Sequence, residues 1–409
     1  MKRALICTVG VGSGIERPIL KSIEDHNPDM VLFLVTKKSE KKIEIIKERY
    51  NKDLEIKVED ISNPDDIQKC YDESLDSFSK LIDEGFDSSD IFLNITSGTK
   101  PMSSGLALAG VSMKCGSLSY VTGDRDQDGR VKNGTERVYS MGPRLPIADS
   151  MLSQAKTYFN EYAYKSAYDV SEEVLKDNKL SRVGKEAEYM STLSHGYFKW
   201  DMFKHSEARE IFKDIDGGEM DRGQQFQFGM NITHLEKCIE DKKTEAGVGE
   251  YLLVDIFANM ERRIKKGEFD DAVARGYRCL EMLGQYLLWE EYGIHHADVK
   301  IDTNIFDDDQ VKMLRSWRGD KDTLSVGLRR VWRILGMLDE GLSEDSIEEK
   351  GFEGILTARN KSILAHGSDP VSEDTSLKFR DQLKKELEDN IDDFERKLEN
   401  GRHMRVGEM

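Results

Sequence analysis

The sequence lacks the long apolar run that a membrane-spanning helix requires. None of its segments approaches the roughly 20 consecutive apolar residues that cross a bilayer. The apolar stretch at residues 4–9 is interrupted at Gly10, which makes it too short for a signal peptide. We therefore expect a cytoplasmic protein with no membrane partner.

Signatures of disulfides and of zinc sites are also missing. The 5 cysteines stand far apart, contain no C-x-x-C pair and are odd in number. Scattered cysteines of this kind are typical of free thiols in a reducing compartment. We expect five free thiols and no bound metal.

Positive charge is not in excess. Lysine and arginine number 60 against 78 aspartates and glutamates, which gives a formal net charge of −18. A protein that binds nucleic acid over its whole surface needs basic residues to neutralise phosphates. The composition argues against that mode and predicts no DNA partner, but it leaves room for a local basic cleft.

The first part of the chain alternates short apolar runs with charged helical stretches. The apolar runs predict strands at residues 4–9, 30–35, 54–58, 91–95 and 118–121. Helical patterns lie between them, at 18–25, 40–50, 64–84 and 100–114. This alternation predicts parallel β-α-β units with helices on both faces of one sheet. A turn-rich hairpin is expected over residues 121–140.

The strand pattern ends near Pro143 and Pro146, and helical spacing continues to the C-terminus. Two weak echoes of a helical-hairpin repeat, at 197–208 and 267–272, are too few for a solenoid. The predicted fold class is therefore α/β followed by all-α. A Rossmann-like domain spans residues 1–145, a helical linker 146–248 and a helical domain 249–409.

Two glycine-containing loops each follow a predicted strand and precede a predicted helix. The first has G-x-G-x-G spacing from Gly10, with Ile15 where a dinucleotide fingerprint has its third glycine. The second strand is followed by Thr36 and Lys37 rather than by the acidic residue that binds a ribose. A dinucleotide-dependent oxidoreductase is therefore disfavoured.

The second loop, residues 94–102, reads Asn-Ile-Thr-Ser-Gly-Thr-Lys-Pro-Met. Its hydroxyls, its backbone N–H groups and Lys100 at the start of a helix all favour an anion. The spacing before Lys100 is not that of a Walker motif, so ATP hydrolysis fits poorly. Serine and threonine at such a turn also act as simple helix caps, and this alternative stays open. Both loops leave the carboxyl ends of parallel strands, where open α/β sheets bind ligands.

The strand and loop at 4–14 and the run at 94–102 resemble the CRISPR-associated Rossmann-like (CARF) sensor domain. The second run is similar to that family's phosphate-contacting signature, with serine where a second glycine is more usual. The resemblance implies a homodimer that binds a cyclic oligoadenylate activator across its two-fold axis. It assigns this ligand to Gly10, Ser13, Thr96, Ser97, Gly98, Thr99, Lys100 and Met102.

The hairpin carries a calcium-loop look-alike. Asp124-x-Asp126-x-Asp128-Gly129 begins such a loop, but its twelfth position holds Thr135 and Glu136 comes one residue late. We expect a hairpin tip without a metal.

A second polar group of residues lies near the C-terminus. A capping box from Ser346 to Glu349 predicts a helix start, and Gly367 predicts its end. On such a helix Leu356, Arg359, Ile363 and His366 share one stripe, with Asn360 beside it. Arg359 and His366, seven positions apart, are the two polar residues of this otherwise apolar stripe.

The run from Arg359 to His366 resembles the R-x4–6-H signature of HEPN ribonuclease domains, with six residues between the two. The stretch at 259–281 is similar to the helical part of a CRISPR-associated family in which such a domain follows a CARF domain. The resemblance implies a cyclic-oligoadenylate-activated endoribonuclease of type III CRISPR defence. Single-stranded RNA is the implied substrate, at a composite site across the dimer.

These side chains suit RNA cleavage without a metal or other cofactor, because RNA supplies its own 2′-hydroxyl nucleophile. His366 exchanges a proton near neutral pH, and its place near a helix end favours the protonated form. Arg359 stabilises charge on the phosphate, while Asn360 orients the phosphate or the histidine.

Two other functions stay open. The chain is a non-catalytic adaptor or a sink for the messenger, or its N-terminal domain slowly cleaves the cyclic ligand through Ser13, Thr96 and Thr99. The adaptor interpretation leaves Arg359 and His366 unexplained.

Overall fold

The computed structural model describes residues 2–50, 54–127, 131–178, 181–301, 304–319, 321, 323–338, 351–362 and 368–407. Its internal contacts divide the chain into two compact units, Met1–Met151 and Leu152–Met409. Across the described residues, every helix is too short or too polar to span a membrane. The five cysteines are free and buried.

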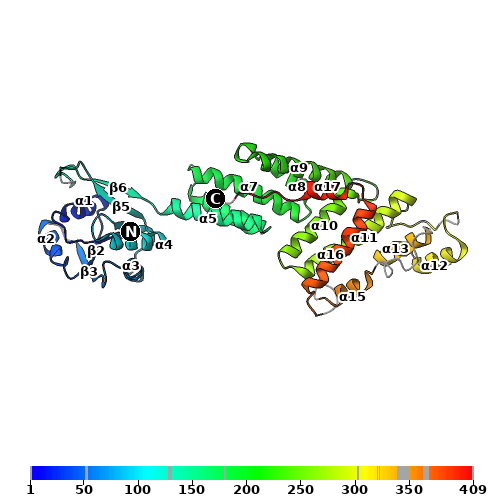
Figure 1. Cartoon of the computed structure of the whole chain (residues 1–409), viewed down its shortest axis with the longest axis horizontal. Coiled ribbons are helices and arrows are strands. Elements are labelled where there is room, and N and C mark those ends of the chain that lie inside the picture. The colour runs from blue at the N-terminus through cyan, green and yellow to red at the C-terminus, as the bar shows by residue number, and fades with distance from the viewer. Residues whose placement is uncertain are drawn as a thin grey trace. The chain divides into compact units, whose positions relative to one another are not determined.

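The first unit is built on a six-stranded sheet in the order β3-β2-β1-β4-β5-β6 (Figure 1). The first five strands in the chain pair in parallel, and β6 pairs antiparallel with β5 as the predicted hairpin. Central strands β1 and β2 are buried along their whole length, as expected for a sheet covered on both faces. The strands are β1 Ala4–Thr8, β2 Met30–Val35, β3 Glu55–Asp60, β4 Ile91–Asn94, β5 Ser117–Thr122 and β6 Arg137–Met141.

Helices cover both faces of this sheet. Alternate β1 residues point to opposite sides, so Leu5 lies in one apolar core with residues of α1 and α2. Ile6 lies in the other core with residues of α3 and α4. The predicted Rossmann-like α/β fold is therefore confirmed. The helices are α1 Glu16–His26, α2 Lys41–Arg49, α3 Ile67–Asp83, the 3-10 turn η1 Ser88–Asp90 and α4 Lys100–Ser112.

Small residues let α4 approach α3 closely. A Cβ atom added to Gly105 would lie 2.7 Å from the backbone of both Cys70 and Tyr71 on α3. Such contacts require the two helices to move apart, because backbone atoms cannot rotate away as a side chain can. The glycine therefore sets the distance between α3 and α4.

The second unit is helical, as predicted, and its described residues add only one isolated bridge, between Ser362 and Asp369. Its helices are α5 Arg144–Asn160, which starts in the first unit, α6 Tyr164–Asn178, α7 Arg182–Asp201, α8 His205–Phe212, η2 Gly217–Glu219, α9 Arg222–Asp241, α10 Glu250–Lys265, α11 Phe269–Tyr292, α12 Asp308–Arg318, α13 Leu328–Leu338, α15 Glu353–Lys361, α16 Glu373–Asn390 and α17 Phe394–Gly401.

The C-terminal segment returns to the middle of the chain. Helix α17 packs against α9 and α10 (Figure 1). The buried Asn231 amide of α9 donates to the carbonyl oxygens of Asn400 and Arg402, at 2.8 and 2.7 Å. Its oxygen accepts from the Tyr197 hydroxyl at 2.6 Å and from the Met404 N–H at 3.2 Å. A fully bonded buried amide of this kind fixes the segment in one register.

At Gly105 in the α3–α4 contact, helix propensity and packing have opposite effects on stability. Alanine is the better helix former by up to about 1 kcal/mol, but overpacking at Gly105 costs about 1–3 kcal/mol. We expect Gly105→Ala to destabilise the first unit by about 1–2 kcal/mol, with roughly ten-fold faster amide exchange in α3 and α4. Hydrogen-exchange mass spectrometry of the full chain measures this.

Gly229→Ala in α9 is the matched control, because a Cβ at Gly229 meets no atom within 4 Å. It should leave exchange in α9 unchanged or slower. Slower exchange in α4 of the Gly105→Ala variant would show that the two helices tolerate the extra methyl group.

Candidate functional site

The two loops singled out in the sequence meet at one edge of the sheet. Strands β1 and β4 are neighbours, so the loops that follow them leave the sheet where its strand order reverses. The Thr8 hydroxyl donates to the Ser97 carbonyl oxygen, and the Ser97 hydroxyl donates to the Thr8 carbonyl oxygen at 2.5 Å. This reciprocal pair ties the second loop to the end of β1.

Glycine is required at the contact between the loops. Gly98 has a φ of +94°, where a side chain is strained, and a Cβ there would lie 3.0 Å from the Thr8 Cβ. A Cβ on Gly10 would lie 3.0 Å from the Gly98 nitrogen. Gly10 and Gly98 therefore allow the two backbones to touch.

Most of the second loop's hydroxyls hold the loop itself. Thr99 caps α4 by accepting from the Met102 N–H at 3.3 Å, and its own proton goes to the Pro64 carbonyl oxygen. The helix-cap alternative is therefore correct for Thr99. Thr96 differs, because its oxygen accepts from the Val121 N–H at 2.8 Å and its proton has no acceptor among the residues that the structure describes.

A cavity of about 840 Å³ lies beside these loops, between the start of α1 and the hairpin. Ser13 and Thr96 are the two predicted ligand residues that line it. Sequence reasoning missed the other polar and aromatic lining groups, because they come from α1, β5 and the hairpin. They include Arg17, Tyr120, Arg125 and Lys132, with Asp126 and Glu136 as acidic neighbours.

The other predicted ligand residues take different places. Gly10, Ser97, Gly98 and Thr99 form the loop contacts described above, and Lys100 is exposed as the first residue of α4. Met102 is a correction: its side chain is only 1% exposed and packs in the core beneath the loop. It supports the loop from below and presents no surface to a ligand.

The hairpin is folded by hydrogen bonds of its own backbone and threonine. The Thr135 hydroxyl accepts from the Asp124 N–H at 3.0 Å and donates to the Lys132 carbonyl oxygen at 2.8 Å. Asp128 and Gly129 lie outside the described residues. The sequence offered one signal for this cavity, the aromatic residue Tyr120 inside a predicted strand. The structure leaves the Tyr120 side chain 42% exposed.

The helix predicted through Gly367 is shorter than expected. Helix α15 ends at Lys361, because Ser362 adopts extended backbone with φ −76° and ψ 158° and bridges to Asp369. Of the proposed stripe, only Leu356 and Arg359 lie on the described helix α15. Several predicted positions lie outside the described residues: Ser346, Glu349, Ile363, His366 and Gly367.

Arg359 lies on α15 and faces α11. Its guanidinium sits 4.4 Å from the centre of the Tyr277 ring and donates to the Asn360 side-chain oxygen at 3.1 Å. Leu356, one turn earlier, is buried. Stacking on an aromatic face restricts the orientation of the guanidinium, and a guanidinium held in this way can still donate edge N–H groups to an anion.

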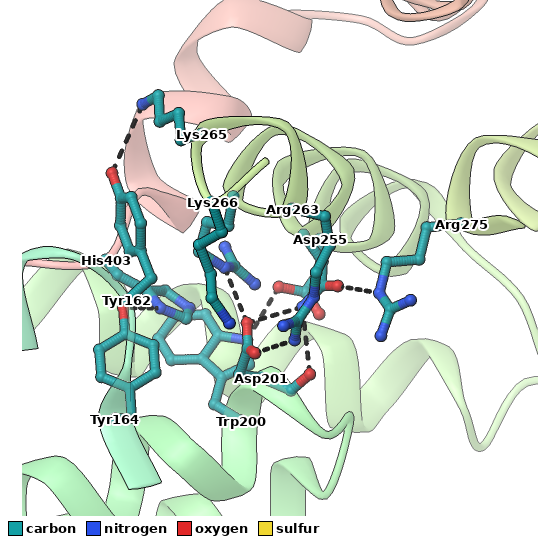
Figure 2. Close-up of polar contacts among 12 residues, drawn as sticks. Tyr162, Tyr164, Trp200, Asp201, Asp255, Arg263, Lys265, Lys266, Arg275 and His403 are labelled. Carbon is teal, nitrogen blue, oxygen red and sulfur yellow. Dashed lines mark hydrogen bonds and ion pairs between the residues drawn. The ribbon is translucent and has the colours of Figure 1, made fainter. Parts of the chain in front are cut away.

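The stretch at 259–275 forms a buried polar junction (Figure 2). Asp201, at the end of α7, accepts from Asn259 at 2.8 Å and from the Arg262 Nε at 3.0 Å, and it pairs with Arg263. Figure 2 shows the side chains of Asp201 and Arg263 pointing toward each other between α7 and α10. Arg275 of α11 donates to the Asn259 oxygen. These residues therefore join three helices.

A second buried carboxylate lies next to this junction. Asp255 accepts from the Trp200 indole at 2.8 Å and contacts the His205 Nε2 at 2.9 Å. Burial alone would raise the pKa of Asp255, but the hydrogen bond from His205 and the positive charges nearby lower it to about 2. Asp255 is therefore ionised at neutral pH in the interior of the protein.

Family models match three consecutive parts of the chain. Residues 18–149 match the Card1 CARF domain, residues 147–240 the Csm6 6H domain and residues 242–389 the Csm6 HEPN domain. The CARF match contains the second loop and begins just after the first, and the HEPN match contains Arg359 and His366. No curated protein sequence matches the chain significantly.

A solved Csm6 structure shares the fold. Enterococcus italicus Csm6 bound to cyclic hexa-2′-fluoro-hexa-dAMP has a TM-score of 0.60 at 16% identity, over 98% of both chains. Can2 from Sulfobacillus thermosulfidooxidans in complex with cyclic tetra-adenylate is 13% identical over 52% of this chain and 68% of its own. Its TM-score is 0.26, which does not show a shared fold. With the three domain matches in this order, the chain belongs to the CRISPR-associated CARF–HEPN proteins, with a CARF domain, a 6H domain and a HEPN domain.

Proposed function

We propose that this protein is an endoribonuclease of type III CRISPR defence that a cyclic oligoadenylate activates. The observation that carries the proposal is the cavity at the reversal of strand order in the CARF domain, in a chain that also contains a HEPN domain. The fold shared with a Csm6 that binds a cyclic nucleotide analogue supports it.

The cavity has the chemistry that an oligonucleotide ring requires. Arg17, Arg125 and Lys132 provide positive charge for phosphates, and Tyr120 presents an aromatic face. Backbone N–H groups at the start of α4, with Lys100, add a second anion-binding element. The 2′-hydroxyls and phosphates of the ring would meet Ser13 and Thr96.

The HEPN domain supplies the proposed reaction. The 2′-hydroxyl of single-stranded RNA attacks the adjacent phosphorus, and the bond to the 5′-oxygen breaks. His366 exchanges protons with these oxygens, Arg359 stabilises the charge on the phosphate, and Asn360 orients it. The products are a 2′,3′-cyclic phosphate and a 5′-hydroxyl, and the step requires no metal ion.

The ligand site yields a binding prediction. We expect Lys100→Ala to weaken cyclic oligoadenylate binding about ten-fold or more, because it removes a cation at a helix N-terminus. Arg17→Ala should also weaken binding, since Arg17 lines the cavity. Isothermal titration calorimetry with each ring size measures both effects.

Lys114→Ala is the control, since Lys114 is exposed just beyond the other end of α4. It should bind like the wild type. Unchanged affinity in the Lys100→Ala variant would remove Lys100 from the site, and absence of binding by the wild type would refute the sensor function.

The reaction yields a catalytic prediction. We expect His366→Ala to lose about 10²–10⁴ in cleavage rate while retaining ligand binding, because a general acid–base is removed. Arg359→Ala should behave similarly, and the double variant should lose little more, because the two residues act as one unit. The assay uses labelled single-stranded RNA, each cyclic oligoadenylate and EDTA.

His295→Ala, in a loop of the same domain, is the matched control and should cleave at the wild-type rate. A folded His366→Ala protein with wild-type activity would contradict the assignment. No cleavage with any messenger would favour the adaptor or sink, and loss of the messenger without RNA cleavage would favour ligand cleavage by the CARF domain.

The composite sites yield an assembly prediction. One chain supplies a single Arg359–His366 pair, so we propose that the active form is a homodimer. Light scattering should give twice the 46.7 kDa mass of one chain. A fully active species at the mass of one chain would overturn this proposal.

A further inference from the structure

Three potential metal ligands meet inside the helical unit, apart from the proposed ligand and ribonuclease sites. His205 begins α8, Cys238 lies near the end of α9 and Asp255 lies on α10. One ligand atom from each lies within 4.8 Å of those of the other two, and all three residues are buried. Imidazole, thiolate and carboxylate are the ligands that zinc prefers.

The surroundings of the carboxylate match those of a metal ligand. The Trp200 indole donates to one Asp255 oxygen at 2.8 Å (Figure 2). This hydrogen bond fixes the orientation of the carboxylate from outside the group of three potential ligands. Outer hydrogen bonds of this kind commonly orient carboxylates that bind metals. The other oxygen faces His205, whose Nδ1 has no hydrogen-bond partner among the described residues.

A second histidine lies on the same helix face as Cys238. His234 comes one turn earlier on α9 and is fully buried. Neither of its ring nitrogens makes a hydrogen bond of regular geometry with the described residues, although the Lys397 backbone lies close. Gly401 leaves room for this ring, because a Cβ there would lie 2.8 Å from the His234 Cε1.

We infer that His205, Cys238 and Asp255 bind one divalent transition-metal ion of the zinc class. His234 lies outside the group of atoms within 4.8 Å of one another, so its ring would have to move inward to become the fourth ligand. The ion is structural and ties α8 and α9 of the 6H domain to α10 of the HEPN domain. This inference does not depend on the proposed ribonuclease function.

Charge and geometry both favour this ion. The two positive charges of the metal balance one thiolate and one carboxylate, so the buried site is neutral overall. Binding releases the Cys238 thiol proton to solvent and leaves a neutral nitrogen on each histidine, without oxidation or reduction. Zinc–ligand distances of about 2.0–2.3 Å place ligand atoms roughly 3.3–3.8 Å apart. The His205–Asp255 contact of 2.9 Å therefore lengthens slightly, and the thiol moves inward.

Metal content and cobalt absorption of the full-length protein test the inference. The chain is produced in zinc- or cobalt-supplemented medium, exchanged into metal-free buffer and measured by inductively coupled plasma mass spectrometry. We expect about one ion per chain, and the cobalt form should show thiolate-to-cobalt charge-transfer absorption with the strong visible bands of tetrahedral coordination.

Two buried cysteines give a matched pair of variants. Cys238 donates to the Tyr251 carbonyl oxygen at 3.4 Å, and Cys279 donates to that of Leu253 at 3.5 Å, so both thiols contact α10. Cys238→Ser should lose the metal and the charge-transfer absorption, whereas Cys279→Ser should keep both. Metal-free wild-type protein, a cobalt form without thiolate absorption, or equal metal in both variants would overturn the inference. The wild-type measurements decide the question even if Cys238→Ser fails to fold.

Discussion

Asp201 places a buried carboxylate against Arg262 and Arg263 at the end of α7. Removing a charge from water is costly unless partners replace its hydration, and here two guanidinium groups and the Asn259 amide do so. If Asp201 were lost, the buried Arg262 would lose its carboxylate partner, at a cost of about 3–5 kcal/mol, whereas Arg263 would keep Glu268 and Asp271. The 6H helices therefore keep a fixed position against α10, and α10 in turn packs on α11.

The position of α11 restricts the orientation of the Arg359 side chain. The Arg359 guanidinium packs on the ring of Tyr277 from α11, and α15 packs against α11 in the HEPN domain. The residues that resembled a family pattern at 259–281 thus serve mainly as the framework of the domain. A family pattern need not consist of catalytic residues, because a buried ionic junction also restricts which residue types fit.

In the CARF domain the corresponding constraint is the contact between the two loops. Thr8 and Ser97 exchange hydrogen bonds, and Gly98 accepts a backbone conformation that a side chain would strain. The hydroxyls of Ser97 and Thr99 are occupied in this way, and those of Ser13 and Thr96 line the cavity with cationic groups from other elements, such as Arg17 and Lys132.

The sequence alone determined the features that depend on local patterns. The apolar runs at 4–9 and 30–35 predict strands from their residue types alone, and the structure has strands at 4–8 and 30–35; the loop at 94–102 begins a helix because threonine and proline favour that start. Contacts between distant residues were decided only by the tertiary structure. It buried Met102, ended α15 at Lys361, and brought His205 to Asp255 across 50 positions. No periodicity encodes such meetings, because they depend on how whole helices pack and on which partner replaces the water lost by each polar group.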